Sequence, residues 1–184
     1  METLPDYLKP DLRILSVGLN PSIPSVEAGF YFANPRNRFW KALQQSILVD
    51  EVLTPGVVSI EKMFSDHGIG FTDLVKRPTP GMKQLKAVDY RADAPVLFDK
   101  IMRYKPVVVW FHGKVTWQKF LRYAMQEKCG EVGGSEWGEQ PLKFDGIHFY
   151  VTPNPSPANA AFSLDDLVAW YDKLARYLIS IHEL

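Results

Sequence analysis

The chain has 184 residues, 46% of them apolar and 23% charged, and its 21 basic and 21 acidic side chains give a formal net charge of zero. A domain of this length can bury about 70% of the surface of its unfolded chain, and this composition excludes a disordered or fibrous protein. The balanced charge excludes a protein that is basic throughout, so a partner such as DNA would have to meet a local basic patch.

Cysteine usage and the N-terminus exclude further classes. Cys129 is the only cysteine, which excludes a disulfide framework and a thiolate metal site. Residues 1–13 lack a basic stretch followed by an apolar core, and no apolar run is long enough to cross a membrane. We therefore expect a cytoplasmic protein without a signal peptide or a membrane partner.

The first half of the chain begins with a predicted strand and continues with predicted helices. The apolar run at residues 12–17, ended by Gly18, predicts a buried strand. Apolar residues at helical spacing predict a helix over residues 38–48. A second helix is expected over residues 59–68, with Gly68 as its C-cap.

The middle of the chain predicts a helix, a strand and another helix. The strand is expected at residues 106–113, where an unbroken apolar run indicates a parallel strand covered on both faces. A helix is expected before it, over residues 92–105, with these residues on one face: Val96, Leu97, Ile101 and Tyr104. The helix after the strand carries these apolar residues at helical spacing: Trp117, Phe120, Leu121 and Ala124.

The last part of the chain predicts a hairpin and a terminal helix. The hairpin spans residues 141–151, with a tight turn at Asp145-Gly146. The helix spans residues 163–179 and begins with Ser163 and Asp166 in a capping-box arrangement. The alternation of strands and helices predicts an α/β fold, a three-layer sandwich with a mainly parallel central sheet. We expect one domain over residues 1–184, with residues 1–11 as an N-terminal extension.

The tripeptide Asn-Pro-Ser follows two of the predicted strands, at residues 20–22 and 154–156. Ligands of open α/β sheets bind beyond the carboxyl ends of the strands. Proline stiffens the chain there, and Asn and Ser offer donors and acceptors whose directions are then fixed. The tripeptide is also ordinary turn chemistry, but two copies at strand ends favour two walls of one crevice. Residues 18–40, rich in proline and aromatic residues and without periodicity, predict a long functional loop beside it.

Five blocks in this order resemble the mismatch-specific uracil/thymine-DNA glycosylase family, which is part of the uracil-DNA glycosylase superfamily. They read "GLNPS", "GFYFANPRNRFW", "GIGFTDLVKRPTPG", "WFHGK" and "TPNPS", and they extend over about residues 13–177. The resemblance implies a base excision repair enzyme with a uracil-DNA glycosylase-like fold and no cofactor. Such an enzyme flips uracil out of DNA and hydrolyses its N-glycosidic bond, which leaves an abasic site.

The resemblance also implies a base pocket formed by Gly18, Leu19, Ser25 and Phe32. The ring of Phe32 would stack on the flipped base, a contact worth about 1–3 kcal/mol. Backbone N–H groups around Leu19 and Phe32 would stabilise the departing anion. Ser25 would lie near the 5-carbon and favour uracil over thymine, although one methyl group is worth only about 1–3 kcal/mol.

Two residues are implied in catalysis, Asn20 and Asp73. In the family the Asn of the first motif holds the attacking water, but an amide cannot take a proton at neutral pH. Asp73 departs from the family pattern, which has a non-acidic residue at this place. A carboxylate in the pocket could accept the proton that Asn20 cannot. An aspartate here is equally compatible with a helix cap or a surface position.

The second Asn-Pro-Ser segment implies contacts with DNA by Asn154, Pro155 and Ser156, and Asn159 is the following side chain that could reach a base edge. Family members continue with a bulky wedge and an arginine that contacts the widowed guanine, where this chain has residues 157–160, "PANA". We therefore expect no strict dependence on a guanine mismatch, so uracil in single strands or opposite any base becomes a substrate.

Phosphate attraction requires a local basic cluster, because the net charge is zero. The candidates are Arg36, Arg38, Lys76, Arg77 and Lys114. Each of them is also compatible with a solvated surface position.

The remaining ionisable residues suggest neither a metal nor a lyase step. The histidines lack the spacing of metal ligands, and His112 is interpreted as a hydrogen-bonded structural residue. No lysine is placed as an amine nucleophile, so we expect a monofunctional enzyme that acts as a monomer on uracil-containing DNA in the nucleoid. The alternatives are a glycosylase for xanthine, hypoxanthine or the thymine of a G:T pair, and a weakly catalytic module that binds DNA lesions.

Overall fold

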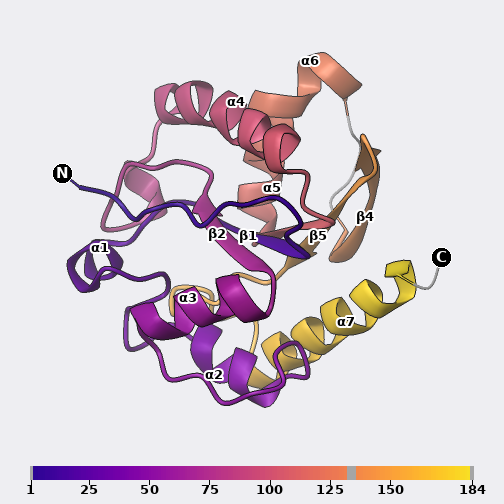
Figure 1. Ribbon diagram of the computed structural model, residues 1–184. Helices are drawn as coiled ribbons and strands as arrows, with labels where there is room; N and C mark the ends of the chain where they lie inside the picture. Colours follow the sequence, from indigo (N-terminus) through magenta and orange to yellow (C-terminus); the bar gives the residue numbers. More distant parts are fainter. Residues whose placement is uncertain (1, 132–135, 183–184) are drawn as a thin grey trace.

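A five-stranded sheet forms the centre of the structure, in a computed structural model that describes residues 2–131 and 136–182 (Figure 1). Its strands are β1 (Ile14–Gly18), β2 (Ile69–Asp73), β3 (Val108–His112), β4 (Gly138–Phe144) and β5 (Ile147–Thr152). The order across the sheet is β2-β1-β3-β5-β4, in which β2, β1, β3 and β5 are parallel and β4 is antiparallel to β5.

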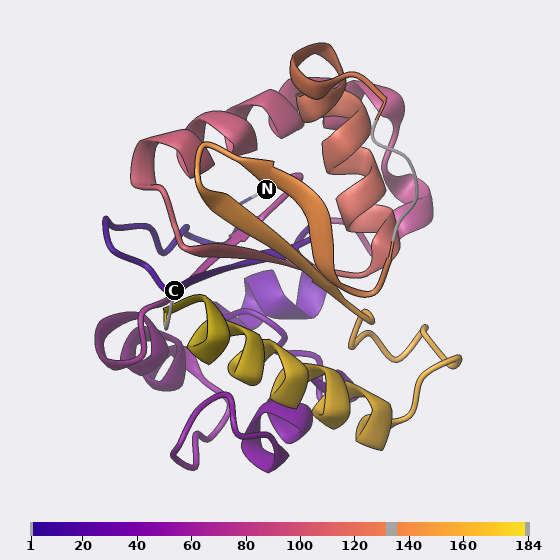
Figure 2. The ribbon, with the colours of Figure 1, turned by 90° about the vertical axis from the view of Figure 1, so that its right-hand side faces the viewer.

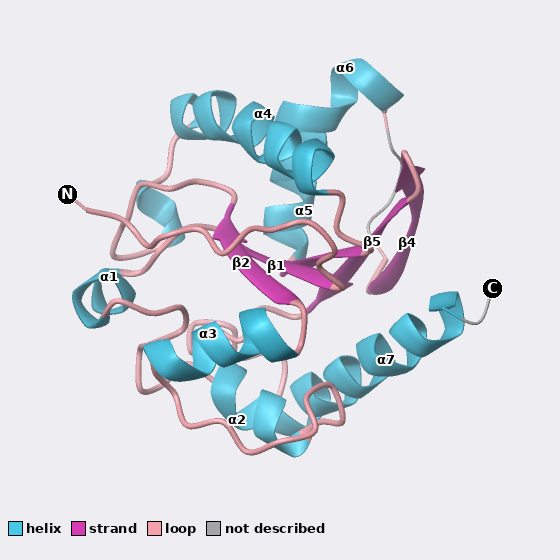
Figure 3. Cartoon of the chain, in the orientation of Figure 1, coloured by secondary structure: helices cyan, strands magenta, loops and turns pink. Residues whose placement is uncertain are grey.

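Helices cover both faces of the sheet, so the expected three-layer α/β sandwich is confirmed (Figure 3). One layer holds α2 (Phe39–Gln45), α3 (Val57–Asp66) and α7 (Leu164–His182). The other holds α4 (Ala87–Tyr104), α5 (Lys114–Phe120), the π-helical turn η2 (Leu121–Met125) and α6 (Gln126–Cys129). Two short helices, α1 (Ile23–Ala28) and the 3-10 helix η1 (Met82–Gln84), lie in the loops that follow β1 and β2. None of the helices in the described part of the chain is long and apolar enough to cross a membrane.

The apolar runs of the strands bury side chains on both faces, as expected for parallel strands. Val108 and Trp110 of β3 belong to the core under α2, α3 and α7, while Val109 and Phe111 belong to the core under α4 and α5. Helix α7 runs beside the β4–β5 hairpin and closes the first of these cores (Figure 2). The carboxyl ends of the parallel strands are thereby held between two packed layers.

The end of the chain follows the sequence prediction closely. Ser163 and Asp166 form the expected capping box, in which each backbone N–H donates to the other side chain, at 2.8 and 3.1 Å. The β4–β5 hairpin turns at Asp145 and Gly146, whose φ values of 52° and 78° are those of a tight turn that favours this pair.

Other expectations about local structure are wrong. Residues 18–40 are not irregular throughout, because α1 forms within them with Ser22 as its cap. Strand β2 was missed, since Gly70 and Thr72 interrupt its apolar pattern. Helix α3 ends at Asp66 with His67 as its C-cap, and Gly68, with φ of 64°, instead turns the chain into β2. Val96 is exposed, because α4 turns Leu97 and Ile101 inward.

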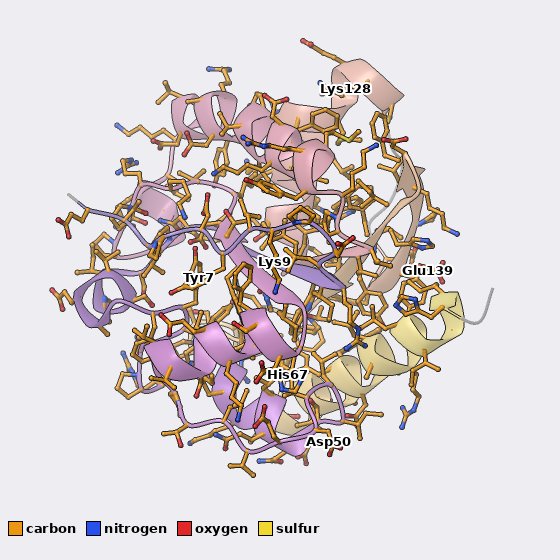
Figure 4. All side chains as sticks on the ribbon, viewed as in Figure 1. Tyr7, Lys9, Asp50, His67, Lys128 and Glu139 are labelled. Atoms are coloured by element: carbon orange, nitrogen blue, oxygen red, sulfur yellow. The ribbon has the colours of Figure 1, made fainter. Side chains whose placement is uncertain are left out.

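Residues 2–11, expected as an extension, pack along the free edge of β2. Tyr7 and Phe71 exchange two backbone hydrogen bonds of 2.9 and 3.1 Å, and Leu4 is buried. The ring of Tyr7 also packs edge-on against Phe64 of α3, and the ammonium group of Lys9 lies 4.5 Å from the centre of the Phe64 ring (Figure 4). This N-terminal segment therefore protects an edge strand that would otherwise be open.

Gly70 is required at this edge because a side chain there would collide with the N-terminal segment. A Cβ at residue 70 would overlap the carbonyl oxygen of Tyr7 and lie 2.6 Å from Leu12 Cδ1. We expect Gly70→Ala to lower the free energy of unfolding in urea by about 2–3 kcal/mol. The control is Gly81→Ala, whose nearest contact would be the flexible end of Gln84 at 3.3 Å. Equal unfolding midpoints for the two variants would contradict this reading of the edge.

Candidate active site

A pocket of about 550 Å³ opens at the carboxyl ends of the parallel strands. The chain leaves β1 toward β2 on one side and leaves β3 toward β5 on the other, so the ends of β1 and β3 form the switch point of the sheet. The loops that follow β1, β2, β3 and β5 all contribute to the walls. This is where an open α/β sheet binds its ligand.

The two Asn-Pro-Ser segments line this one pocket, as the sequence predicts. Asn20 and Ser22 come from the loop after β1, and Asn154 and Ser156 from the loop after β5. Gly113, between β3 and α5, makes room for the second segment: a Cβ there would lie 3.2 Å from Asn154 Cβ, and its φ of 95° disfavours any other residue.

The amide of Asn20 is fixed by its hydrogen bonds. Its Nδ2 donates to the carbonyl oxygen of Arg77 at 3.0 Å and to Thr79 Oγ1 at 2.7 Å, while Thr79 donates to the carbonyl oxygen of Gly81 at 2.8 Å. Because carbonyl oxygens only accept, the nitrogen must face Arg77 and Thr79. Oδ1 makes no hydrogen bond within the described protein and is the atom left to hold a water.

Phe32 is held in a strained and supported conformation. Its φ of 59° lies in the left-handed region, which is unusual for a bulky residue and is most often seen at functional sites. Its ring stacks on Phe39 with centroids 4.0 Å apart and meets His112 edge-on at 5.1 Å. Phe39 therefore fixes one face of an aromatic wall that lines the pocket.

Asp73 ends β2 inside the pocket and is only 5% exposed. It pairs in register with Gly18, where a Cβ would lie 2.6 Å from Asp73 Oδ1, so the missing side chain of Gly18 accommodates the carboxylate. Oδ2 is buried without a hydrogen-bond partner. Burial raises the pKa of Asp73 to about 7, against the opposing effect of the Lys76 charge. The carboxyl group can thus both release and accept a proton near neutrality.

The other residues expected to bind the base also line the pocket. Gly18 and Leu19 lie at the end of β1, and Ser25 is buried in α1. The Ser25 hydroxyl is already engaged, because it accepts from Ala33 N at 3.2 Å and from Ser22 Oγ at 2.9 Å. Ser25 thus braces the loop that carries Phe32, in addition to any contact with a ligand.

His112 lies at the end of β3 and is only partly satisfied, contrary to the expectation of a fully hydrogen-bonded histidine. Its Nε2 is 2.8 Å from Ser16 Oγ, and its Nδ1 is buried without a partner. Burial lowers the pKa of His112 to about 3, so the ring is neutral at physiological pH. Across the described residues, no three His, Cys, Asp or Glu side chains gather in a way that could hold a metal.

Arg38 braces the second Asn-Pro-Ser loop through hydrogen bonds to its backbone. Its guanidinium group donates to the carbonyl oxygens of Ser156 at 3.2 Å, Asn159 at 2.9 Å and Phe162. Asn159 Nδ2 in turn donates to the carbonyl oxygen of Asn154 at 3.0 Å. Arg38 and Asn159, expected to contact DNA, therefore hold the loop in shape, while Asn154, Ser156 and Asn159 line the pocket and Pro155 is buried outside its lining.

Two more of the expected cations are engaged within the protein. Lys76 Nζ lies 2.8 Å from Asp6 Oδ1. Arg77 makes a two-pronged ion pair with Asp89, at 2.9 Å from Nε and 2.8 Å from Nη2. Neither side chain lines the pocket. Both form ion pairs that connect the loop after β2 to other segments of the chain.

The remaining two cations are better placed for an anion. Lys114 lines the pocket, with Nζ 4.4 Å from the centre of the Trp137 ring. Arg36 is exposed, and its guanidinium group makes no hydrogen bond or ion pair with the part of the chain that the structure describes. Lys114 is the one of the five expected cations that lines the pocket.

Sequence reasoning missed several residues of the lining. Tyr31 and Thr79 lie inside blocks that carry the family resemblance, so their positions beside Phe32 and Asp73 in those blocks were the available signal. Leu4 and Trp137 come from segments that no motif marks, and only the fold brings them to the pocket. The missed lining residues include Leu4, Tyr31, Asn37, Thr79, Met82, Trp137 and Phe162.

Comparison with known proteins identifies the family. The family model described as the uracil DNA glycosylase superfamily matches residues 5–177. The chain belongs to the uracil DNA glycosylase superfamily. The fold is also similar to a solution NMR structure from Methanosarcina acetivorans, named as a candidate uracil DNA glycosylase, with a TM-score of 0.61 and 20% sequence identity over 97% of this chain and 98% of that one. Neither comparison distinguishes the mismatch-specific family within the superfamily.

The role of Arg38 can be separated from that of a surface cation by comparison with Arg36. We expect Arg38→Met to lower the free energy of unfolding by about 2–3 kcal/mol, because it strands buried carbonyl oxygens. Amide hydrogen exchange over residues 154–162 should rise in the same variant. Arg36→Met is the matched control and should leave both stability and exchange unchanged. Unchanged exchange in Arg38→Met would contradict the bracing role.

Proposed function

We propose that this protein is a monofunctional uracil-DNA glycosylase of the mismatch-specific type, which acts as a monomer on uracil-containing DNA in the nucleoid. Membership of the superfamily supports a DNA glycosylase, and the pocket supports the choice of reaction. The observation that carries the proposal is the meeting of a fixed amide, a buried carboxylate and a braced aromatic ring in one pocket: Asn20, Asp73 and Phe32.

In the proposed reaction, water adds to C1′ of the deoxyribose as the bond from C1′ to N1 of uracil breaks. The bonding electrons leave with N1, and the sugar passes through a cationic state that a carboxylate stabilises. Asn20 Oδ1 orients the water, and the Asp73 carboxylate accepts its proton. That proton then passes to the uracil anion or to solvent. Phe32 would hold the base by stacking.

A lyase step would require an amine that attacks C1′. Lys114 is the lysine of the pocket lining, and its ammonium group lies over the Trp137 ring. We assign it to phosphate attraction, which keeps the proposed enzyme monofunctional. Strand cleavage should then require alkali or heat after the base has left.

Specificity in the proposed enzyme follows from the second Asn-Pro-Ser loop. Ala158 and Asn159 line the pocket where a wedge and an arginine would read the widowed guanine, and the amide nitrogen of Asn159 already donates to Asn154. With no long side chain to read the opposite base, excision should not depend strictly on a G mismatch.

The proposal is tested with excess enzyme and end-labelled DNA that carries uracil opposite G, opposite A or in a single strand. Abasic sites are then cleaved with alkali. We expect product from all three substrates, and none from matched DNA that carries thymine in place of uracil in an A:T pair. Cleavage of the G mismatch alone would overturn the proposed specificity. Product from xanthine or hypoxanthine but not from uracil would move the protein to another substrate.

Asp73 should set the pH dependence of excision. A proton acceptor works only when ionised, so the single-turnover rate should rise with pH through about 7 and then level off. Asp73→Asn should abolish this rise and reduce the rate about a hundredfold or more, at least as much as Asn20→Ala. An unchanged rate in Asp73→Asn would remove the carboxylate from the mechanism.

The same variant should be more stable than the wild type above neutral pH. The folded-state pKa of Asp73, about 7, lies above its ordinary value of 3.8. The folded state therefore binds more protons than the unfolded state between these values, and stability falls as pH rises from about 4 to about 7. Asp73→Asn removes that loss, on the order of 2–4 kcal/mol at pH 8. Equal stabilities at pH 8 would show that the carboxylate is not strained by burial.

A further inference from the structure

The N-terminal segment brings a second carboxylate close to the pocket. Asp6 Oδ1 accepts from Thr72 Oγ1 at 2.7 Å and from Lys76 Nζ at 2.8 Å, and Asp6 Oδ2 accepts from Lys100 Nζ at 2.6 Å. Its partners come from β2, from the loop after β2 and from α4. One carboxylate thus collects two lysines from different elements at the strand that carries Asp73.

The cluster of Asp6, Lys76 and Lys100 adjoins the pocket through Tyr31, which is part of the pocket lining. The Tyr31 hydroxyl donates to the carbonyl oxygen of Pro5 at 2.8 Å, and Lys76 Nζ lies 3.4 Å from that hydroxyl. Leu4 of the same segment is part of the pocket wall. The segment is therefore continuous with the site although it carries no glycosylase motif.

The charges of this cluster act on the pKa of Asp73, the proposed base, in both directions. Lys76 and Lys100 favour its ionised form, Asp6 opposes it, and burial opposes it most. Tyr31 is neutral, since burial and the nearby carboxylates raise the pKa of its hydroxyl. Asp93 of α4 accepts from the backbone N–H of Lys76 at 2.8 Å and helps to hold that loop.

We propose that Asp6 is a positioning residue, which keeps Lys76 and Lys100 in ion pairs outside the pocket and so leaves the Asp73 carboxylate without a cation partner. This inference rests on the role of Asp73 proposed above. A carboxylate that pairs with an ammonium group is a weaker proton acceptor, because the pair stabilises its ionised form. Without Asp6, two unpaired lysines would lie within electrostatic reach of Asp73, and the site would lose the basicity that burial provides.

The test compares the pH dependence of single-turnover uracil excision in Asp6→Asn and Lys100→Met. Asp6→Asn keeps the shape and an acceptor for Thr72 but removes the charge, so the rise in rate should move to lower pH by roughly one unit. The plateau should fall severalfold. Lys100→Met removes a cation and should move the rise to higher pH. A structural defect would lower the rate without moving the profile in opposite directions.

The control is Glu51→Gln, because Glu51 is also a carboxylate with two side-chain partners outside the pocket, Lys62 at 2.6 Å and His67 at 2.5 Å. Its profile should match the wild type. NMR titration of the Asp73 carboxyl carbon in the same proteins gives a readout that does not depend on activity. An identical Asp73 titration in Asp6→Asn and wild type overturns the inference. A wild type that cuts no uracil DNA instead removes the proposed function, and the titration still decides whether Asp6 acts on Asp73.

Discussion

The site depends on the parallel pairing of β1 with β2, because this pairing sets Gly18 opposite Asp73. A shift of one residue would turn Asp73 to the other face of the sheet. Gly18 is as necessary as the register, since any side chain there would overlap the carboxylate. The first residue of the glycosylase-like "GLNPS" block therefore has a packing reason that concerns a different strand.

Two features of the pocket lining are costly to the folded state. Asp73 is a carboxylate withdrawn from water with one oxygen unpaired, and Phe32 is a bulky residue in the left-handed region. Each lowers the free energy of unfolding, and its benefit lies in ligand binding. Phe39 connects Phe32 to the core, because it is fully buried and stacks directly on Phe32. Rigid support of this kind keeps a strained side chain in one orientation.

The sequence predicted the sheet and the position of the pocket better than it predicted the work of individual side chains. Strand β3 and the capping box of α7 follow from local patterns, because long apolar runs and caps act on neighbours in the sequence. Strand β2 was missed because Gly70 serves a contact with Tyr7, which is visible only in three dimensions. Leu4 and Trp137 reach the pocket through the fold, and no local pattern could have placed them there.

The charged residues show most clearly what sequence alone leaves open. Arg38, Lys76 and Arg77 stand beside recognisable motifs, and each is bound within the protein to carbonyl oxygens or carboxylates. A cation that is already paired within the protein adds little to DNA binding. The electrostatic part of the affinity grows with the number of phosphates that free Lys and Arg side chains neutralise. Only Arg36 and Lys114 of the expected set then remain for that attraction. The grip on DNA would therefore rest mainly on the shape of the two Asn-Pro-Ser loops, the second of which Arg38 braces through the carbonyl oxygens of Ser156 and Asn159.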